Sequence, residues 1–378
     1  MKVDLSGALL NEFRKAEKEY EEAIARGDAE EAKKAAMKCA RLLREIAKYA
    51  PNREHYLKLA EKWEKASDVK IRRAVSEDGK ETEEDFSNYV KSFISQSKVT
   101  WNDIAGLDDV KRLMKETIVL SLIQKPESIQ PWKGIMLFGP PGTGKTLLAS
   151  ACAGSLKATF FNVRTSMILS KYFGESSKIV SALYDVAREK SPSIVFIDEF
   201  DALTTRRDEM SEASRRMLAT ILAELDGFID KKSERFVLTL AATNTPWDLD
   251  EAVLSRFSRR IYVPLPDKEA IKAMIRIHTK GLELKADLEA IAARCVEKFY
   301  SGRDVSALCK EATWNMVREM NRLEELANLP FEELMKKRLN LRPLTLNDFE
   351  EAFKKIKSPL TKKEIERYEK WAEEFGSR

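Results

Sequence analysis

The feature that most constrains this chain is a glycine-rich octapeptide, GPPGTGKT, at residues 139–146. The apolar run 135–138 precedes it and a helical pattern follows it, which predicts a turn between a buried strand and a helix. Glycines in such a turn let backbone N–H groups point inward around phosphate oxygens, at the positive end of the helix. Lys145 would neutralise phosphate charge, and the hydroxyl of Thr146 would ligate Mg²⁺. The sequence therefore predicts a site for a nucleoside triphosphate with Mg²⁺.

Two acidic residues and an amide are predicted at the ends of later strands. Asp198 and Glu199 follow the apolar run 194–197, and Asn244 follows the run 236–242. In a phosphate-loop fold such strand ends lie beside the triphosphate and its metal. Asp198 is expected to hold Mg²⁺, directly or through water, and Glu199 to polarise the attacking water. The amide of Asn244 would position that water or contact the terminal phosphate, so the set predicts a hydrolase.

The arrangement of apolar patterns predicts an α/β domain followed by a helical one. Between residues 99 and 265, β-rich apolar runs alternate with helical patterns; the runs are 135–138, 159–163, 194–197, 236–242 and 260–263. This alternation is typical of a five-stranded parallel sheet covered by helices on both faces. From residue 266 to 378 the patterns are helical only, which predicts a small helical lid.

A separate helical region is predicted before the α/β domain. Apolar residues recur every three or four positions in three stretches between residues 9 and 63, so residues 1–70 are expected to form a three-helix bundle. Residues 71–98 are mostly polar and are interpreted as a linker that ends in a short docking helix.

Composition excludes several functional classes. The 66 basic and 62 acidic residues are interleaved and form no basic stripe, so nucleic acid is not an expected partner. The four cysteines lie far apart among apolar residues and are expected to be reduced. No apolar run approaches the roughly 20 residues that span a bilayer. We therefore expect a cytoplasmic protein.

Over essentially its whole length the chain resembles AAA ATPases of the meiotic clade, in particular the vacuolar-protein-sorting type that disassembles ESCRT-III filaments and its archaeal cell-division relative. The resemblance is carried by WNDIAGL at 101–107, GPPGTGKT at 139–146, IDE at 197–199, ATNTPW at 242–247 and RFSRRIYVPLP at 256–266. It implies an AAA+ large domain with a small lid, ATP and Mg²⁺ as ligands, and a ring, most simply a homo-hexamer.

The resemblance also implies roles for individual residues. Those implied to contact the nucleotide are Asp103, Ala105, Gly106, Pro141, Gly142, Thr143, Gly144, Lys145, Thr146, Leu147, His278 and Gly302, with Mg²⁺ at Thr146 and Asp198. The implied catalytic residues are Glu199, Asn244, Arg259 and Arg260. The two arginines would act as paired fingers on ATP in the adjacent subunit, with Arg256 as a helper. The chain departs from the family at Arg303, where the Ser-Gly-x-Asp element of the lid commonly has a small residue.

Two further segments carry expectations about partners. Lys171, Tyr172 and Phe173 resemble the first pore loop, whose aromatic and apolar side chains grip a polypeptide in the central channel. The N-terminal bundle resembles a microtubule-interacting-and-transport (MIT) domain, whose grooves bind short tail motifs of filament subunits. Between residues 316 and 344 the lid pattern continues as helix and loop without a strand-rich insertion, which favours the archaeal branch.

The leading hypothesis is an ATP-driven ring that binds ESCRT-III-like filaments and threads their subunits through its pore, during membrane scission or cell division. Contact with the membrane would be indirect, through the filaments. One alternative is a microtubule-severing ATPase like katanin or spastin; the mixed charge of residues 67–98 argues against the extended basic linker that those enzymes need. Another alternative is a nonhydrolysing scaffold, which would not need the acid that activates water.

Overall fold

The computed structural model describes residues 12–13, 15–20, 23, 29–49, 56–57, 59–60, 63, 83–123, 126, 132, 134–171, 175–203, 212–227 and 236–377. Its internal contacts divide the chain into two units, Met1–Asp85 and Phe86–Arg378. Among the residues described, no helix is both long enough and apolar enough to cross a membrane.

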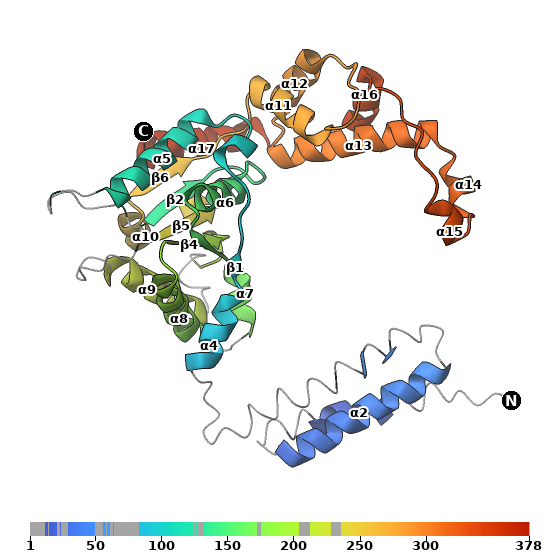
Figure 1. The fold of residues 1–378 in the computed structure, drawn as a ribbon. Helices are drawn as coiled ribbons and strands as arrows, with labels where there is room; N and C mark the ends of the chain where they lie inside the picture. The colour runs from blue at the N-terminus through green and yellow to red at the C-terminus, as the bar shows by residue number, and fades with distance from the viewer. Residues whose placement is uncertain are drawn as a thin grey trace. The chain divides into compact units, whose positions relative to one another are not determined.

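The N-terminal unit contains the helix α2, Ala29–Tyr49 (Figure 1). One face of α2 is buried because Ala36, Cys39, Leu43 and Ile46 recur at helical spacing. This face packs against described helical residues of the segments 12–23 and 56–63, as the three predicted helical stretches require. Trp63 supplies the central ring of the packing. Its indole lies edge-on to Phe13 and Tyr20, with ring centroids 6.1 and 5.0 Å away.

The second unit is built on a six-stranded sheet of order β1-β3-β4-β5-β2-β6. The strands are β1 Ile94–Ser95, β2 Gly134–Phe138, β3 Thr159–Arg164, β4 Ser193–Asp198, β5 Val237–Thr243 and β6 Arg259–Tyr262. All pairs are parallel except β1 with β3. The predicted five-stranded parallel sheet is confirmed. The additional strand β1 is antiparallel and lies within the segment interpreted as a linker.

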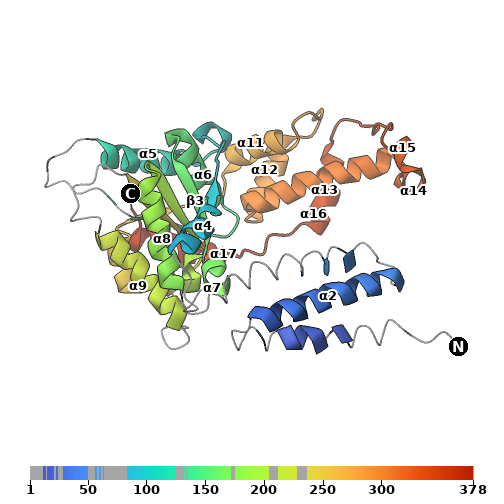
Figure 2. The ribbon, with the colours of Figure 1, turned by 60° about the horizontal axis from the view of Figure 1, so that its bottom comes forward.

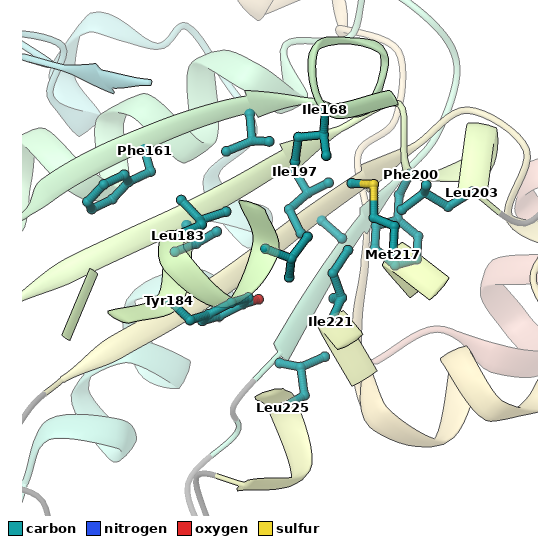
Figure 3. Packing of buried hydrophobic residues seen from close by; sticks show 14 of the residues in the cluster. Phe161, Ile168, Leu183, Tyr184, Ile197, Phe200, Leu203, Met217, Ile221 and Leu225 are labelled. Atoms are coloured by element: carbon teal, nitrogen blue, oxygen red, sulfur yellow. The ribbon is translucent and has the colours of Figure 1, made fainter. Parts of the chain in front are cut away.

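Helices cover both faces of this sheet. Side chains alternate along β2, so that Ile135 and Leu137 enter a core with α5, Asp108–Leu122, and α6, Lys145–Leu156. Met136 enters the opposite core, with α8, Ser176–Glu189, and α9, Glu212–Gly227. Figure 3 shows part of this second core, where Leu183 and Tyr184 of α8 and Ile221 of α9 pack on the sheet. Burial on both faces explains why the parallel strands read as continuous apolar runs.

The smaller elements of this unit connect and flank the sheet. They are α4 Glu83–Lys91, α7 Thr165–Lys171, α10 Glu251–Arg256 and three short 3₁₀ turns, η1 Trp101–Asp103, η2 Phe200–Leu203 and η3 Pro246–Asp248. The position of α4 agrees with the helix expected at the end of the linker, because Phe86, Val90 and Phe93 are buried in the core shared with α8 and α9.

A lid of helices with its own core follows β6. It consists of α11 Lys268–His278, α12 Leu288–Glu297, α13 Gly302–Met320 and α16 Leu346–Lys355, with the short helices α14 Leu323–Ala327 and α15 Phe331–Leu334 between α13 and α16. Both ribbon views show α11, α12 and α16 gathered around α13 (Figures 1 and 2). Between residues 316 and 344 the chain forms helix and loop without a strand, as expected.

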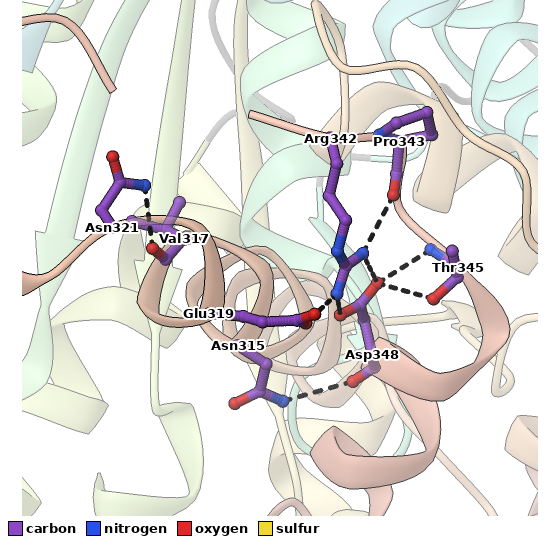
Figure 4. A network of polar contacts seen from close by, with 8 residues as sticks. All are labelled: Asn315, Val317, Glu319, Asn321, Arg342, Pro343, Thr345 and Asp348. Atoms are coloured by element: carbon purple, nitrogen blue, oxygen red, sulfur yellow. Dashed lines mark hydrogen bonds and ion pairs between the residues drawn. The ribbon is translucent and has the colours of Figure 1, made fainter. Parts of the chain in front are cut away.

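A buried ion pair fixes the return of the chain from α15 to α16 (Figure 4). The guanidinium of Arg342 donates to both carboxylate oxygens of Asp348, at 2.7 and 2.8 Å, and also pairs with Glu319 on α13. Asp348 accepts further bonds from the backbone N–H and the hydroxyl of Thr345, at 2.8 and 3.0 Å. Burial alone would raise the pKa of Asp348, but the bonds from Arg342 and Thr345 outweigh it and hold that pKa below its ordinary value.

The last helix, α17 Lys362–Phe375, leaves the lid and packs on the α/β domain. The ring of Trp371 lies 4.5 Å from that of Phe138, the last residue of β2, and Tyr368 lies 4.9 Å from Trp247. Beyond the helix, Ser377 exchanges two hydrogen bonds with the backbone of Arg260 in β6, at 2.7 and 2.9 Å. The end of the chain therefore covers the edge strand of the sheet.

Candidate functional site

Three neighbouring strands bring the predicted chemistry to one edge of the sheet. The order β4-β5-β2 places their carboxyl ends side by side. The 139–146 loop follows β2, Asp198 and Glu199 lie at the end of β4, and Asn244 follows β5. In open α/β sheets, ligands bind outside the carboxyl ends of the strands. The structure therefore assembles at one edge the residues that the sequence grouped by pattern alone.

The loop after β2 has a backbone that only glycine adopts readily at three positions. Gly139, Gly142 and Gly144 have φ angles of 147°, 80° and 96°. A Cβ on Gly139 would also lie 2.3 Å from the carbonyl oxygen of Val263. The hydroxyl of Thr143 donates to the carbonyl of Pro140 at 3.0 Å, which closes the turn from within. Pro141 is half-buried and Leu147 exposed on the first turn of α6.

Lys145 lies beneath this loop. Its ammonium donates to the carbonyl oxygens of Gly139 and Pro140, each at 2.8 Å, and its side chain is buried. Burial lowers the pKa of Lys145 to about 8, although the nearby carboxylates Asp198 and Asp201 act in the opposite direction. An ammonium held this way supplies positive charge at the mouth of the loop, where phosphate oxygens could replace the two carbonyls.

The chemistry of Thr146 and Asp198 fits a magnesium ion. The Thr146 hydroxyl donates to a carboxylate oxygen of Asp198 at 2.9 Å, so two hard oxygen ligands lie together at the start of α6 and the end of β4. Mg²⁺ in nucleotide sites takes few protein ligands and completes its octahedron with phosphate and water. The described part of the chain contains no cluster of three or more acidic, histidine or cysteine side chains that could enclose a metal.

Glu199 has an unusual backbone for a glutamate. Its φ is 55°, in the left-handed region that costs a residue with a side chain of the order of 1–3 kcal/mol. The hydroxyl of Thr165 supports this conformation by donating to the carbonyls of Asp198 and Glu199, at 3.0 and 3.2 Å. The residue itself is exposed at the strand end. A strained, solvent-facing acid beside the phosphate loop is consistent with a base that activates water.

The backbone of Asn244 is fixed from two sides. Its N–H donates to a carboxylate oxygen of Asp201 at 3.3 Å, and its carbonyl accepts from the hydroxyl of Tyr368 on α17. Neither partner was predicted from the sequence. The acidic run 198–201 carried a weak signal for Asp201, whereas Tyr368 lies 124 positions away and carried none.

The 103–106 segment also contacts the lid. A Cβ on Gly106 would lie 2.6 Å from that of Ala270 in the first turn of α11, and Ala105 beside it is half-buried. Asp103 uses its carboxylate to cap η1, accepting from the N–H and hydroxyl of Thr100 at 2.7 and 2.8 Å, and these bonds lower its pKa. This carboxylate is therefore committed to local structure.

His278 is not part of that contact. It lies exposed at the other end of α11, about 12 Å along the helix axis from Ala270 at 1.5 Å per residue. Its pKa is lowered, first by burial and then by Lys310. Its predicted role beside the base remains a prediction.

The first turn of α13 lies directly on the phosphate loop. The backbone N–H of Arg303 donates to the carbonyl of Gly142 at 3.2 Å, and a Cβ on Gly302 would lie 3.2 Å from the same oxygen. Ser301 and Asp304 form the capping box of the helix, in which the Asp304 carboxylate accepts from Ser301 at 2.7 and 2.8 Å. Asp304 therefore organises the helix start, and Gly302 and Arg303 make the contact.

The predicted arginine fingers lie away from the loop of their own subunit. Arg259 and Arg260 pair with Ile135 and Met136 of β2, so at about 3.3 Å per residue they lie about 10 Å or more along the strands from Gly139. The Arg259 guanidinium packs 5.0 Å from the ring centroid of Trp132. Arg260 donates to the carbonyl of Leu254 at 3.3 Å, and burial lowers its pKa.

Arg256 is presented differently. It ends α10 and donates twice to one carboxylate oxygen of Asp226, at 3.2 and 3.0 Å. Its side chain keeps 36% of its surface exposed, and a surface ion pair of this kind is easily exchanged for a stronger one. The Nε atoms of Arg259 and Arg260, by contrast, are buried without a hydrogen-bond partner in the part of the chain that the structure describes. Arg256 thus differs from the other two in that its guanidinium, Nε included, is held in a surface ion pair.

The predicted pore loop is only partly within the described structure. Lys171 is the last residue of α7, while Tyr172 and Phe173 lie outside the described residues. Their role remains a prediction from the sequence.

Comparison with known protein families gives two matches. Residues 135–265 match the family described as ATPase family associated with various cellular activities (AAA), and residues 323–376 match the Vps4 C terminal oligomerisation domain. The second match covers α14 to α17.

Individual relatives agree with these matches. The chain is 41% identical over 292 residues to the katanin p60 ATPase-containing subunit A1 of Arabidopsis thaliana, which covers 74% of this chain and 55% of katanin. The chain thus spans little more than half the length of that relative. The crystal structure of the FIGL-1 AAA domain in complex with ADP is similar with a TM-score of 0.66 at 32% identity, covering 79% of this chain and 99% of that one. A structure that describes the basis of katanin self-assembly gives a TM-score of 0.63 at 32% identity, covering 79% and 100%.

Proposed function

Because this chain belongs to the AAA ATPases of the meiotic clade, we propose that it binds ATP with Mg²⁺ where β2, β4 and β5 end, and hydrolyses it there. The observation that carries this proposal is the Thr146–Asp198 contact of 2.9 Å beside the buried ammonium of Lys145. Thr146 and Asp198 would hold Mg²⁺, which neutralises phosphate charge when bound. Glu199 would take the proton of the attacking water, and Asn244 would orient that water.

Hydrolysis in this proposal needs a second copy of the chain. The three arginines lie away from the edge that carries the phosphate loop, so they suit a site on a neighbour better than their own. An arginine supplied by a neighbour is worth about 10³ to 10⁵ in rate. We assign the principal role to Arg256, because its guanidinium lies in an exchangeable surface ion pair, whereas the Nε atoms of Arg259 and Arg260 are buried. The match of residues 323–376 to an oligomerisation domain and the self-assembly of katanin support a ring.

The work done by the ring is the dismantling of a protein polymer. The katanin relatives favour severing of microtubules, which is one of the two alternative hypotheses from the sequence. Disassembly of ESCRT-III-like filaments is the second candidate. The match of the C-terminal region to the Vps4 type and the helical packing around Trp63 in the N-terminal unit favour it. Because only about half of katanin is matched, its substrate is a proposal for this chain.

A paired polymer assay tests the proposal. We expect the full chain with ATP to shorten one polymer, either taxol-stabilised microtubules or ESCRT-III filaments, as followed by sedimentation and fluorescence microscopy. Glu199→Gln should still bind ATP but abolish both turnover and shortening, because it removes the base and leaves the phosphate loop intact. Tyr172→Ala should keep ATP turnover and lose shortening.

A different result would contradict each candidate function and the assignment of the catalytic base. Shortening of filaments but not microtubules would reject the severing reading, and the converse would reject the ESCRT-III reading. Full hydrolysis by Glu199→Gln would contradict the assignment of the base.

A further inference from the structure

Arg303 is a cation at the phosphate loop that the ATP site as described does not use. It lies in the first turn of α13, and its backbone N–H is bound to the carbonyl of Gly142 at 3.2 Å. The approach is close: a Cβ on Gly142 would lie 2.9 Å from the Cβ of Arg303. The side chain of Arg303 therefore starts in contact with the loop that would enclose the phosphates.

The guanidinium of Arg303 is not paired with any described residue. It is exposed, and it makes no hydrogen bond or ion pair within the part of the chain that the structure describes. Three other arginines of the lid are paired: Arg294 with Glu350, Arg318 with Glu311 and Arg342 with Asp348. The backbone of Arg303 is thus anchored at the phosphate loop, while the N–H donors of its charged guanidinium remain available to a ligand.

The positive charge of Arg303 acts on Lys145 in the phosphate loop. The pKa of Lys145 is lowered mainly by burial, and the positive charge of Arg303 lowers it further, while Asp198 and Asp201 oppose both. Two cations near one another repel, and an anion between them offsets this repulsion by attracting both. A triphosphate in the loop would supply that anion, and the planar guanidinium matches phosphate oxygens in a two-bond fork.

We propose that Arg303 binds the terminal phosphate of ATP within its own subunit and thereby couples the position of the lid to the presence of that phosphate. This inference rests on the proposed function, because it requires ATP to bind in the loop after β2. Arg303 moves with α13 of the lid, whereas the loop belongs to the α/β domain. When hydrolysis removes the terminal phosphate, the guanidinium of Arg303 would lose its contact. Arg303 would then be joined to the loop only by the hydrogen bond from its backbone N–H to Gly142. A small residue in this position, common in the family it resembles, could not make the contact.

Binding measurements on the full chain test the proposal independently of turnover. The probes are adenylyl imidodiphosphate, which keeps a nonhydrolysable terminal phosphate, and ADP, both with Mg²⁺ in competition against a fluorescent nucleotide. Arg303→Ala should weaken binding of the triphosphate analogue about tenfold to a hundredfold, the loss expected for one charged hydrogen bond, and change ADP binding little. Arg303→Lys should lie between Arg303→Ala and the parent, because it keeps the charge but not the fork.

Controls separate this inference from the function on which it rests. Lys298→Ala removes one positive charge from the same lid at the end of α12 and should bind both nucleotides like the parent. Unchanged thermal unfolding of Arg303→Ala without nucleotide would show that α13 is intact. Equal weakening for ADP and the analogue, or no weakening, would overturn the role of Arg303. If Lys145→Ala also bound both nucleotides normally, the proposed ATP site itself would fail.

Discussion

At the scale of single residues, the environment of Lys145 gives the site a dependence on pH. Its buried ammonium has a pKa of about 8, so part of the free protein carries a neutral amine near that pH. Bound phosphates favour the charged form and raise this pKa. A group whose pKa rises on binding contributes affinity that is complete below the pKa of the free state and is lost as the pH rises through it.

We therefore expect nucleotide affinity to fall as the pH rises through about 8, with uptake of a proton on binding. Titration calorimetry above pH 8, in two buffers of different ionisation enthalpy, measures that uptake. Lys145→Arg is the matched control, because its charge does not titrate in this range. A wild-type profile as flat as that of Lys145→Arg would contradict the assignment.

At the scale of elements, prediction from sequence succeeded where the signal was local. The five parallel strands have continuous apolar runs because both faces of the sheet are buried, and the loop after β2 carries its own motif. The two-residue strand β1 has no such pattern, since Phe93 and Ile94 are the only apolar residues in the polar stretch around it. The contact of Tyr368 with Asn244 and that of Ser377 with Arg260 join segments more than 100 residues apart, and no local pattern encodes them.

The ion pair between Arg342 and Asp348 shows how the lid depends on such contacts. Arg342→Ala would leave a buried carboxylate without its cation, and we expect it to lower the free energy of unfolding by about 3 kcal/mol in urea denaturation. Arg322→Ala, which breaks the exposed pair with Glu325, is the control and should cost less than about 1 kcal/mol. Similar losses of unfolding free energy for Arg342→Ala and Arg322→Ala would contradict the expectation that the buried pair stabilises the lid more than the exposed one.

We expect acid to weaken the stabilising ion pair between Arg342 and Asp348. Because the pKa of Asp348 is held below its ordinary value of 3.8, its contribution to stability is present above that pH and is lost as the pH falls through the lower folded-state value.

At the scale of the whole molecule, we propose that the site is divided between copies. One subunit would contribute the loop, Thr146, Asp198 and Glu199, and its neighbour would contribute Arg256. Such an arrangement predicts that hydrolysis per subunit rises with protein concentration as rings form. In this proposal one terminal phosphate would be bound by Arg303 of the same chain and by Arg256 of the next.

Mixing two inactive variants tests this division most directly. Glu199→Gln lacks the base but keeps Arg256, and Arg256→Ala lacks the arginine but keeps the base, so each alone should hydrolyse ATP at a small fraction of the parent rate. Mixed rings contain interfaces where an intact loop faces an intact Arg256, and the account predicts that the mixture recovers hydrolysis. A mixture of Glu199→Gln with Lys145→Ala, both defective on the loop side, should stay inactive. If Glu199→Gln and Arg256→Ala together hydrolysed ATP no faster than the sum of the two alone, the shared site would be contradicted.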